Sequence, residues 1–221
     1  MRARRGLFGV VIAILAGCQS PSEFGPDATW TVVVYGHGDH NLSPSLRRDI
    51  DEMKAATLRD NINVLVLADW NGSAAGFTSG GEWLRISAGE ANVIETIAEP
   101  DLDDPAVLSA AVEHGFALAP ADRHALILWN HGGAWEGGYG GDTADGRVQG
   151  PGIMMPVVAD SVRAGLDRAG IGQLDLLAFD TCLLGGAESA AEFVGVSASA
   201  LFDGGAGAII EGVPVPVPAR S

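Results

Sequence analysis

The sequence has few cysteines and few basic side chains for its length. Its 221 residues include two cysteines, Cys18 and Cys182, which excludes a disulfide-rich scaffold and a zinc site built on cysteine pairs. Only 13 Lys and Arg residues oppose 28 Asp and Glu residues, for a formal net charge of −15. A chain of this charge is poorly suited to a phosphate backbone, so we expect no nucleic-acid partner, whereas a cationic substrate or a divalent cation suits it. The hydrophobic fraction of 47% is still enough for one domain with a full core.

An apolar run at the N-terminus is too short to cross a membrane as a permanent helix. Residues 1–17 (MRARRGLFGVVIAILAG) combine a basic start with this run, which is typical of a secretory signal peptide. Residues 15–18 (LAGC) resemble the bacterial lipobox, in which the cysteine is lipidated and becomes the mature N-terminus. An ordinary signal peptide followed by a chance cysteine is the alternative. Residues 18–28 then provide the lipidated Cys18 and a short polar tether.

Processing at Cys18 changes both the charge and the thiol count. Removal of residues 1–17 takes away three arginines, which leaves 10 basic against 28 acidic residues and a net charge of −18. Cys182 is then a single thiol in an exported protein. We expect a protein anchored by lipid to the membrane surface of the bacterial cell envelope, without crossing it. By resemblance to other bacterial lipoproteins, Gln19 favours the outer membrane.

From residue 29 onward, short apolar runs alternate with helical patterns. Continuous apolar runs predict buried strands at residues 29–36, 62–69, 124–133 and 174–182. Helical patterns predict helices at residues 43–60, 103–120, 154–170 and 186–193. A hairpin is expected at residues 76–87, with its turn at Gly80 and Gly81.

Two features indicate where these helices begin and end. Ser43 and Pro44 suit the N-cap and the first position of the first helix, and Gly170 suits a C-terminal stop.

The alternation of strands and helices predicts an α/β fold with a mostly parallel sheet covered by helices on both faces. In such folds, the catalytic and ligand-binding residues lie at the carboxyl ends of the strands.

Two predicted strand ends carry groups that fit nucleophilic catalysis. Cys182 is expected where a strand gives way to a helix, near backbone N–H groups that favour a thiolate. His131 ends a neighbouring strand, and Gly132 after it leaves a backbone N–H open to a substrate oxygen. Taken singly, each is more simply explained as a buried thiol or as a strand-end residue. Their joint occurrence at neighbouring strand ends favours catalysis.

Four segments in this order resemble the clostripain-like cysteine peptidases, part of the wider group of caspase-like folds. They are WTVVVYGHGDHNL with DIDEM, INVLVLAD, ALILWNHGGAW and LDLLAFDTCLLGGAE, within residues 29–193. The resemblance implies a caspase-like three-layer sandwich with a His131–Cys182 catalytic dyad. It also implies that Asp180 lies in the pocket for the residue before the scissile bond, where a carboxylate explains a preference for Arg or Lys. From the residues alone, Asp180 is a helix cap or a ligand contact.

The resemblance also gives an expectation for the two histidines of YGHGDHNL. The family usually has a small–Asp–Asn–Asn–Leu pattern here, and this chain has Gly38 to Leu42 (GDHNL). His37 and His40 are therefore interpreted as local variation near the rim of the site, with a structural or rim role. A metal site is the alternative, but the chain has no HExxH or paired-cysteine signature.

The implied reaction is amide hydrolysis through an acyl-enzyme, after Arg or Lys of a peptide or protein substrate. Cys182 attacks, His131 protonates the leaving amine or polarises the scissile bond, and N–H groups near Gly132 and Cys182 stabilise the oxyanion. No cofactor is needed for this chemistry. Relatives often mature by self-cleavage and may use calcium, which makes Arg147 a candidate cleavage point. Asp142 and Asp145 are weak candidates for Ca²⁺ ligands, since their spacing does not match an EF-hand loop.

The last segment departs from the family pattern. The family continues with another strand and an acidic segment, whereas residues 194–221 end in alternating Val and Pro that cannot form an interior strand. We therefore expect a divergent C-terminal segment at residues 194–221, and a truncation here would leave an apolar sheet edge exposed and the pocket incomplete. The alternative function is a catalytically inactive or truncated caspase-like lipoprotein that acts as a binding module. A third possibility is a cysteine hydrolase of another amide or ester class, which would not need Asp180.

Overall fold

The structure is a computed structural model that describes residues 28–56, 60–87, 89–141 and 152–203. Seven strands form one sheet in the order β4-β3-β2-β1-β5-β6-β7. Their bounds are β1 Trp30–Gly36, β2 Ile62–Trp70, β3 Gly80–Ser87, β4 Glu90–Ile97, β5 Arg123–Trp129, β6 Leu176–Asp180 and β7 Ala200–Asp203. The helices are α1 Ser43–Ala55, α2 Pro105–Leu118, α3 Ala134–Gly137, α4 Met155–Ala169 and α5 Ala187–Glu192.

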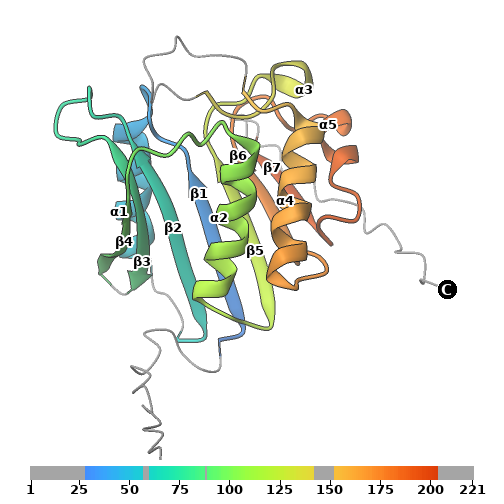
Figure 1. The fold of residues 1–221 in the computed structure, drawn as a ribbon, viewed down its shortest axis with the longest axis horizontal. Coiled ribbons are helices and arrows are strands. Elements are labelled where there is room, and N and C mark those ends of the chain that lie inside the picture. Colours follow the sequence, from blue (N-terminus) through green and yellow to red (C-terminus); the bar gives the residue numbers. More distant parts are fainter. Residues whose placement is uncertain (1–27, 57–59, 88, 142–151, 204–221) are drawn as a thin grey trace, which may run out of the picture.

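The sheet is parallel from β2 through β1, β5 and β6 to β7, and antiparallel where β3 and β4 extend it. In Figure 1, α2 and α4 lie side by side over one face and α1 lies over the other. Side chains of β1 point alternately to the two faces of the sheet. Val33 and Tyr35 pack in the core under α2 and α4, and Val34 packs in the core under α1. The predicted α/β class with a mostly parallel sheet between two helical layers is confirmed.

The helix ends follow local chemistry with one exception. The Asp104 carboxylate accepts a hydrogen bond of 2.8 Å from Ala106 N–H and caps α2. Gly170, with φ of 73°, ends α4 in the left-handed conformation, as predicted. The prediction of Ser43 as the N-cap of α1 is wrong. Leu42 occupies that position, while the Ser43 hydroxyl donates to the Gly38 carbonyl at 2.6 Å and fixes the loop between β1 and α1.

The hairpin prediction for residues 76–87 is wrong. Gly80 and Gly81 do not turn the chain but begin β3, where they pair with Trp70 and Asp69 of β2. The true hairpin joins β3 to β4, a strand that the sequence reading missed. Most residues of β4 are exposed, so its composition lacks the apolar run by which the other strands were predicted. The first helix also ends earlier than predicted, at Ala55.

The sheet continues beyond residue 194, where the sequence departs from the family pattern. Residues 200–203 form β7, which pairs in parallel with β6. The Val-Pro end of the chain lies outside the described residues, as do the N-terminal residues 1–27. Within the part that the structure describes, no helix has the length and apolar character needed to span a membrane.

Candidate active site

Three neighbouring parallel strands end at the same level of the sheet. Gly36 of β1 is in register with Trp129 of β5, and Trp129 is in register with Asp180 of β6. The loops that follow these strands therefore meet at one edge, the upper edge in Figure 1. These loops carry the polar residues of YGHGDHN, WNHGG and FDTC, so the sheet register brings together groups that are far apart in the sequence.

His131 lies two residues beyond β5 and is held on two sides. Its Nε2 is 2.9 Å from Oδ1 of Asn41, and its ring lies on the ring of His40 with centroids 4.7 Å apart. An amide oxygen only accepts, so this bond places the proton on Nε2 and leaves Nδ1 as the basic nitrogen. Burial lowers the pKa of His131, and the charge of His37 lowers it further. The ring is thus kept as a neutral base at neutral pH.

His37 and His40 form a buried layer beneath His131, which fits a structural role and not a position at the rim of the site. Their exposed fractions are 0% and 3%, and their ring centroids lie 5.7 Å apart. Nδ1 of His40 accepts the Leu42 N–H at 3.1 Å. Burial lowers the pKa of His40 to about 4, with smaller contributions from the charges of His37 and His131. His37 in turn lies 3.8 Å from the carboxylate of Asp103.

Cys182 is exposed in the bend that follows β6. The expected helix N-terminus at this thiol is wrong, because α5 begins only at Ala187 and has six residues. The loop that carries His131 instead lies close to the backbone of Cys182. A Cβ at Gly132 would come within 2.0 Å of the Cys182 carbonyl oxygen, so only glycine permits this contact.

The backbone around the two loops has features suited to an oxyanion site. Within the described part of the chain, the N–H groups of Gly132 and Cys182 donate none of the hydrogen bonds found. Two non-glycine residues, Ala134 and Leu183, have φ of 58° and 64°. These left-handed residues lie in the loops that carry His131 and Cys182, and strained backbone of this kind clusters at functional sites.

A cavity of about 260 Å³ opens between these loops and α1. Its lining consists of Leu42, Asp49, Trp129, Asn130, His131, Asp180, Thr181 and Cys182. The structure thus places three of the predicted site residues, His131, Asp180 and Cys182, around one cavity. Two carboxylates and no Lys or Arg line it, and the volume suits one long side chain better than a larger ligand.

Asp49 of α1 and Asn41 are site residues that the sequence reading missed. Asp49 holds its place through a bond of 2.7 Å from Trp129 Nε1 to its Oδ2. It belongs to the DIDEM segment, beside the buried Leu46 and Ile50 of α1, so a helical projection indicates that it lies at the edge of the packed face. Asn41 had a sequence signal only as part of a turn.

Several predicted residues cannot be placed. Cys18, Arg147, Asp142 and Asp145 lie outside the described residues. Among the residues that are described, no group of three or more His, Cys, Asp or Glu side chains is arranged to hold a metal ion. Gly132 and Cys182, the predicted oxyanion donors, lie together beside the cavity.

The chain is similar in sequence and in fold to known cysteine proteases. Clostripain from Hathewaya histolytica is 25% identical over 199 residues, which cover 74% of this chain and 35% of that protein. A secreted cysteine protease from Bacteroides thetaiotaomicron, solved with an irreversible peptide inhibitor, has a TM-score of 0.65 at 23% identity and covers 79% of this chain. An inactive protease zymogen from Parabacteroides distasonis has a TM-score of 0.60 at 21% identity and covers 82%.

The two structural likenesses show the fold. This chain spans 48% and 50% of those solved chains, and about a third of clostripain. A family model described as the clostripain family matches residues 34–198, which include every strand end of the candidate site. The chain therefore belongs to the clostripain family.

Proposed function

We propose that this chain is a cysteine endopeptidase that cleaves after Arg or Lys. The observation that carries the proposal is the cavity at the strand ends, which His131 and Cys182 line together with two carboxylates. A nucleophile, a neutral base and a cation-binding pocket are the three groups that such a reaction needs. Membership of the clostripain family supports the same reading.

Acylation uses the thiol and the imidazole as a pair. His131 takes the proton of Cys182, and the thiolate attacks the carbonyl carbon of the scissile amide, which forms a C–S bond and moves an electron pair to the oxygen. The N–H groups of Gly132 and Cys182 donate to this oxyanion. When the tetrahedral intermediate collapses, the C–N bond breaks and His131 returns its proton to the leaving amine.

Deacylation repeats these steps with water as the nucleophile. His131 removes a proton from water, and the hydroxide attacks the thioester carbon. The C–S bond then breaks, His131 returns its proton to the departing Cys182 thiolate, and the acid product leaves and ionises to the carboxylate. Asn41 is a positioning residue in both halves. Its Oδ1 holds the Nε2–H of His131, which keeps Nδ1 as the basic nitrogen that exchanges protons with the thiol and the substrate.

Specificity comes from the two carboxylates. We assign Asp180 and Asp49 to the pocket for the residue before the scissile bond. A guanidinium or ammonium group in this cavity would form charge-assisted bonds, which are about twice as strong as neutral ones. The Trp129 indole already donates to Asp49, so Asp49 keeps one fixed oxygen and offers the other to the substrate.

The test is hydrolysis of arginyl, lysyl and norleucyl fluorogenic amides by the full chain, with and without Ca²⁺, beside Cys182→Ala. We expect cleavage of the two basic amides and its loss in Cys182→Ala. An arginyl chloromethyl ketone should alkylate Cys182 and no other residue. A folded chain that neither cleaves nor takes up this label would be the inactive binding module, and the proposal would be abandoned.

Self-processing and calcium are separate proposals. Arg147 is our candidate cleavage point, and the structural relative from Parabacteroides distasonis is described as an inactive zymogen, which supports maturation by cleavage. Incubation with Ca²⁺ should convert the full chain into two fragments on a denaturing gel. The conversion should be absent in Arg147→Ala and in Cys182→Ala, and cleavage at another site in Arg147→Ala would reject this assignment.

We also propose export and lipid attachment at Cys18. The basic and apolar start followed by LAGC supports this assignment, and one structural relative is described as secreted. Metabolic labelling with palmitate in a bacterial host should label the chain, with the product in the outer-membrane fraction. Label that persists in Cys18→Ser would contradict it.

A further inference from the structure

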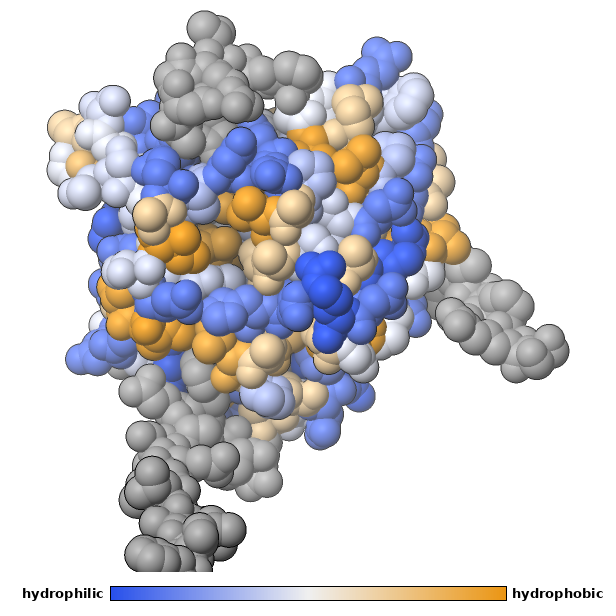
Figure 2. Space-filling model, viewed as in Figure 1, coloured by the Kyte–Doolittle hydropathy of each residue, from blue (hydrophilic) through white to orange (hydrophobic). Residues whose placement is uncertain are grey.

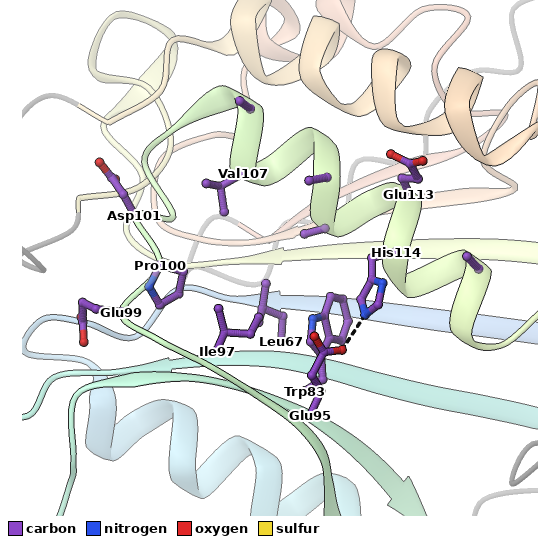
Figure 3. A pocket seen from close by; sticks show the side chains of 14 residues that line it. Leu67, Trp83, Glu95, Ile97, Glu99, Pro100, Asp101, Val107, Glu113 and His114 are labelled. Carbon is purple, nitrogen blue, oxygen red and sulfur yellow. Dashed lines mark hydrogen bonds and ion pairs between the residues drawn. The ribbon is translucent and has the colours of Figure 1, made fainter.

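A second and larger hollow lies between α2 and the β3–β4 end of the sheet. Its volume is about 810 Å³, and its floor is made of Leu67, Trp83 and Ile97. Figure 3 shows these three side chains below α2, with charged groups at both ends of the groove. Figure 2 shows the same region as an apolar strip between hydrophilic borders. The active-site cavity shares none of these residues.

The groove exists because α2 presents small side chains toward it. Ala106, Ala110 and Ala117 form much of the helical wall. On its other side α2 packs closely on α4, where a Cβ at Gly165 would come within 2.5 Å of the Ser109 carbonyl oxygen. This close contact fixes α2 on the sheet beside α4. In the part of the chain that the structure describes, no helix covers the sheet beyond α2 on this face.

The charged groups at the rim have one sign. Four carboxylates line the groove, those of Glu95, Glu99, Asp101 and Glu113, and no Lys or Arg is among its lining residues. Glu95 bonds His114 at 2.7 Å, and Glu113 pairs with an arginine of α4, but both contacts are exposed to solvent, where such pairs are weak. An apolar floor between acidic ends is complementary to a ligand that carries cationic groups beside apolar ones.

We propose that this groove binds a polypeptide segment in which basic and apolar side chains alternate, as an accessory site for substrates. Its role as a substrate site rests on the proposed function, but the binding does not. Basic residues would meet the carboxylates at the ends, and the apolar side chains would cover Trp83 and Ile97. A substrate held here presents further Arg and Lys residues to the cavity at the strand ends.

Two features favour a polypeptide over a small amine. The wall from Ala106 to Ala117 is about 16 Å long at 1.5 Å per helical residue, which accommodates about five residues of an extended chain. In addition, β4 is the edge strand of the described sheet. Its outer N–H and C=O groups can pair with an added strand.

The experiment is calorimetric titration of the full chain carrying Cys182→Ala, which prevents cleavage. The probes are a short peptide of alternating Leu and Lys and its counterpart with Glu in place of Lys. We expect only the Lys peptide to bind, and more weakly as salt rises. Ala110→Trp fills the groove from an exposed helical position and should weaken binding about tenfold. Glu99→Lys should weaken it about threefold.

Two controls locate the binding. Ala55→Trp adds the same indole at an exposed position of α1 outside the groove and should leave the affinity unchanged. Asp180→Asn weakens any binding of Lys in the active-site cavity, so binding that persists in this variant and is weakened by Ala110→Trp belongs to the groove. Three results would overturn the proposal. The first is equal binding of the two peptides, and the second is no binding of the Lys peptide. The third is binding that is lost in Asp180→Asn but kept in Ala110→Trp.

A kinetic comparison separates this proposal from the proposed function. In the active chain, Ala110→Trp should lower kcat/KM for a long basic peptide about tenfold and leave hydrolysis of a single-residue arginyl amide unchanged. An equal loss for both substrates would overturn the accessory role. If the amide is hydrolysed by no form of the chain, the proposed function fails, while the titration still decides the binding.

Discussion

The cavity at the strand ends and the groove beside α2 differ in size, lining and construction. The groove is about three times larger and mostly apolar, and one helix and the antiparallel end of the sheet form it. The cavity is small, and loops after three parallel strands form it together with α1. Only the cavity combines a thiol, an imidazole and carboxylates. Volume therefore indicates where a ligand fits, whereas the convergence of strand ends indicates where a bond can be broken.

The two hollows also differ in how their polar groups are held. In the cavity, His131 is fixed by its hydrogen bond to Asn41 and by its contact with His40 of the buried layer. At the groove, His114 and Glu95 meet on an exposed surface. A catalytic group must keep one geometry, while a binding surface tolerates adjustment. If this division between chemistry and binding holds, substitutions in the cavity change hydrolysis and leave binding at the groove intact.

The largest effect is expected from removal of the thiol. Cys182→Ala should lower hydrolysis of arginyl amides by roughly 10³-fold or more, because no acyl-enzyme can form. Binding of the Lys peptide at the groove should persist in this variant, as measured by titration. Residual hydrolysis above about one per cent would mean that another group acts as the nucleophile, and the assignment of chemistry to the cavity would be wrong.

The next effect is on stability below neutral pH. His40 has a pKa of about 4 in the folded chain against about 6.5 when unfolded. Between these values the unfolded chain binds more protons, so stability is fully present above about pH 6.5 and is lost as pH falls toward 4. The loss amounts to about 3 kcal/mol.

Urea unfolding at a series of pH values measures this loss. His40→Asn should flatten the dependence of unfolding free energy on pH over the same range, whatever its effect at neutral pH. Ala55→Ser at an exposed position of α1 serves as the control and should leave the slope unchanged. An equal slope in the wild type and in His40→Asn would show that the buried layer does not titrate as described.

Specificity should depend on the two carboxylates of the cavity. Asp180→Asn and Asp49→Asn should each lower kcat/KM for arginyl amides about tenfold to a hundredfold and leave the slow hydrolysis of a norleucyl amide unchanged. Asp51→Asn is the matched control, since Asp51 is also on α1 but pairs with Lys54 at the surface. An equal loss on both amides would assign these residues to structure and not to recognition.

Much of the fold could be predicted from the sequence, because buried strands between helices leave a pattern. The apolar runs of β1, β2, β5 and β6 are continuous since both of their faces are covered. The strand β4 lies at an edge with most of its residues exposed, so it lacks the continuous apolar run that identifies the central strands. The strand β7 has only four residues. Its pairing with β6 depends on tertiary structure that no local pattern shows.

The site could be predicted only in part, for a similar reason. His131, Cys182 and Asp180 follow apolar strands directly, so the rule for strand ends finds them. Asn41 and Asp49 need further information, namely the register of β1 against β5 and the position of α1 over the sheet. The burial of His37 and His40 was missed because a polar residue after a strand is ordinarily solvated.

The smallest effect is expected at Asn41, which acts through His131. Asn41→Ala should lower kcat about fivefold to tenfold with little change in KM, since the base loses its fixed tautomer but the pocket is intact. Asn41→Asp tests the geometry further. A carboxylate accepts the same Nε2–H and stabilises the imidazolium, so it should raise the pKa of His131, which burial otherwise lowers.

That change can be followed without turnover. Titration of the His131 ring resonances by NMR in Cys182→Ala should show a higher pKa in Asn41→Asp than in the parent. In the active chain, the acid limb of kcat/KM should move to higher pH by the same amount. A residue that only shapes the loop would alter neither, so an unmoved titration would reduce Asn41 to a structural residue. The cavity would then rely on the buried histidine layer alone to hold its base.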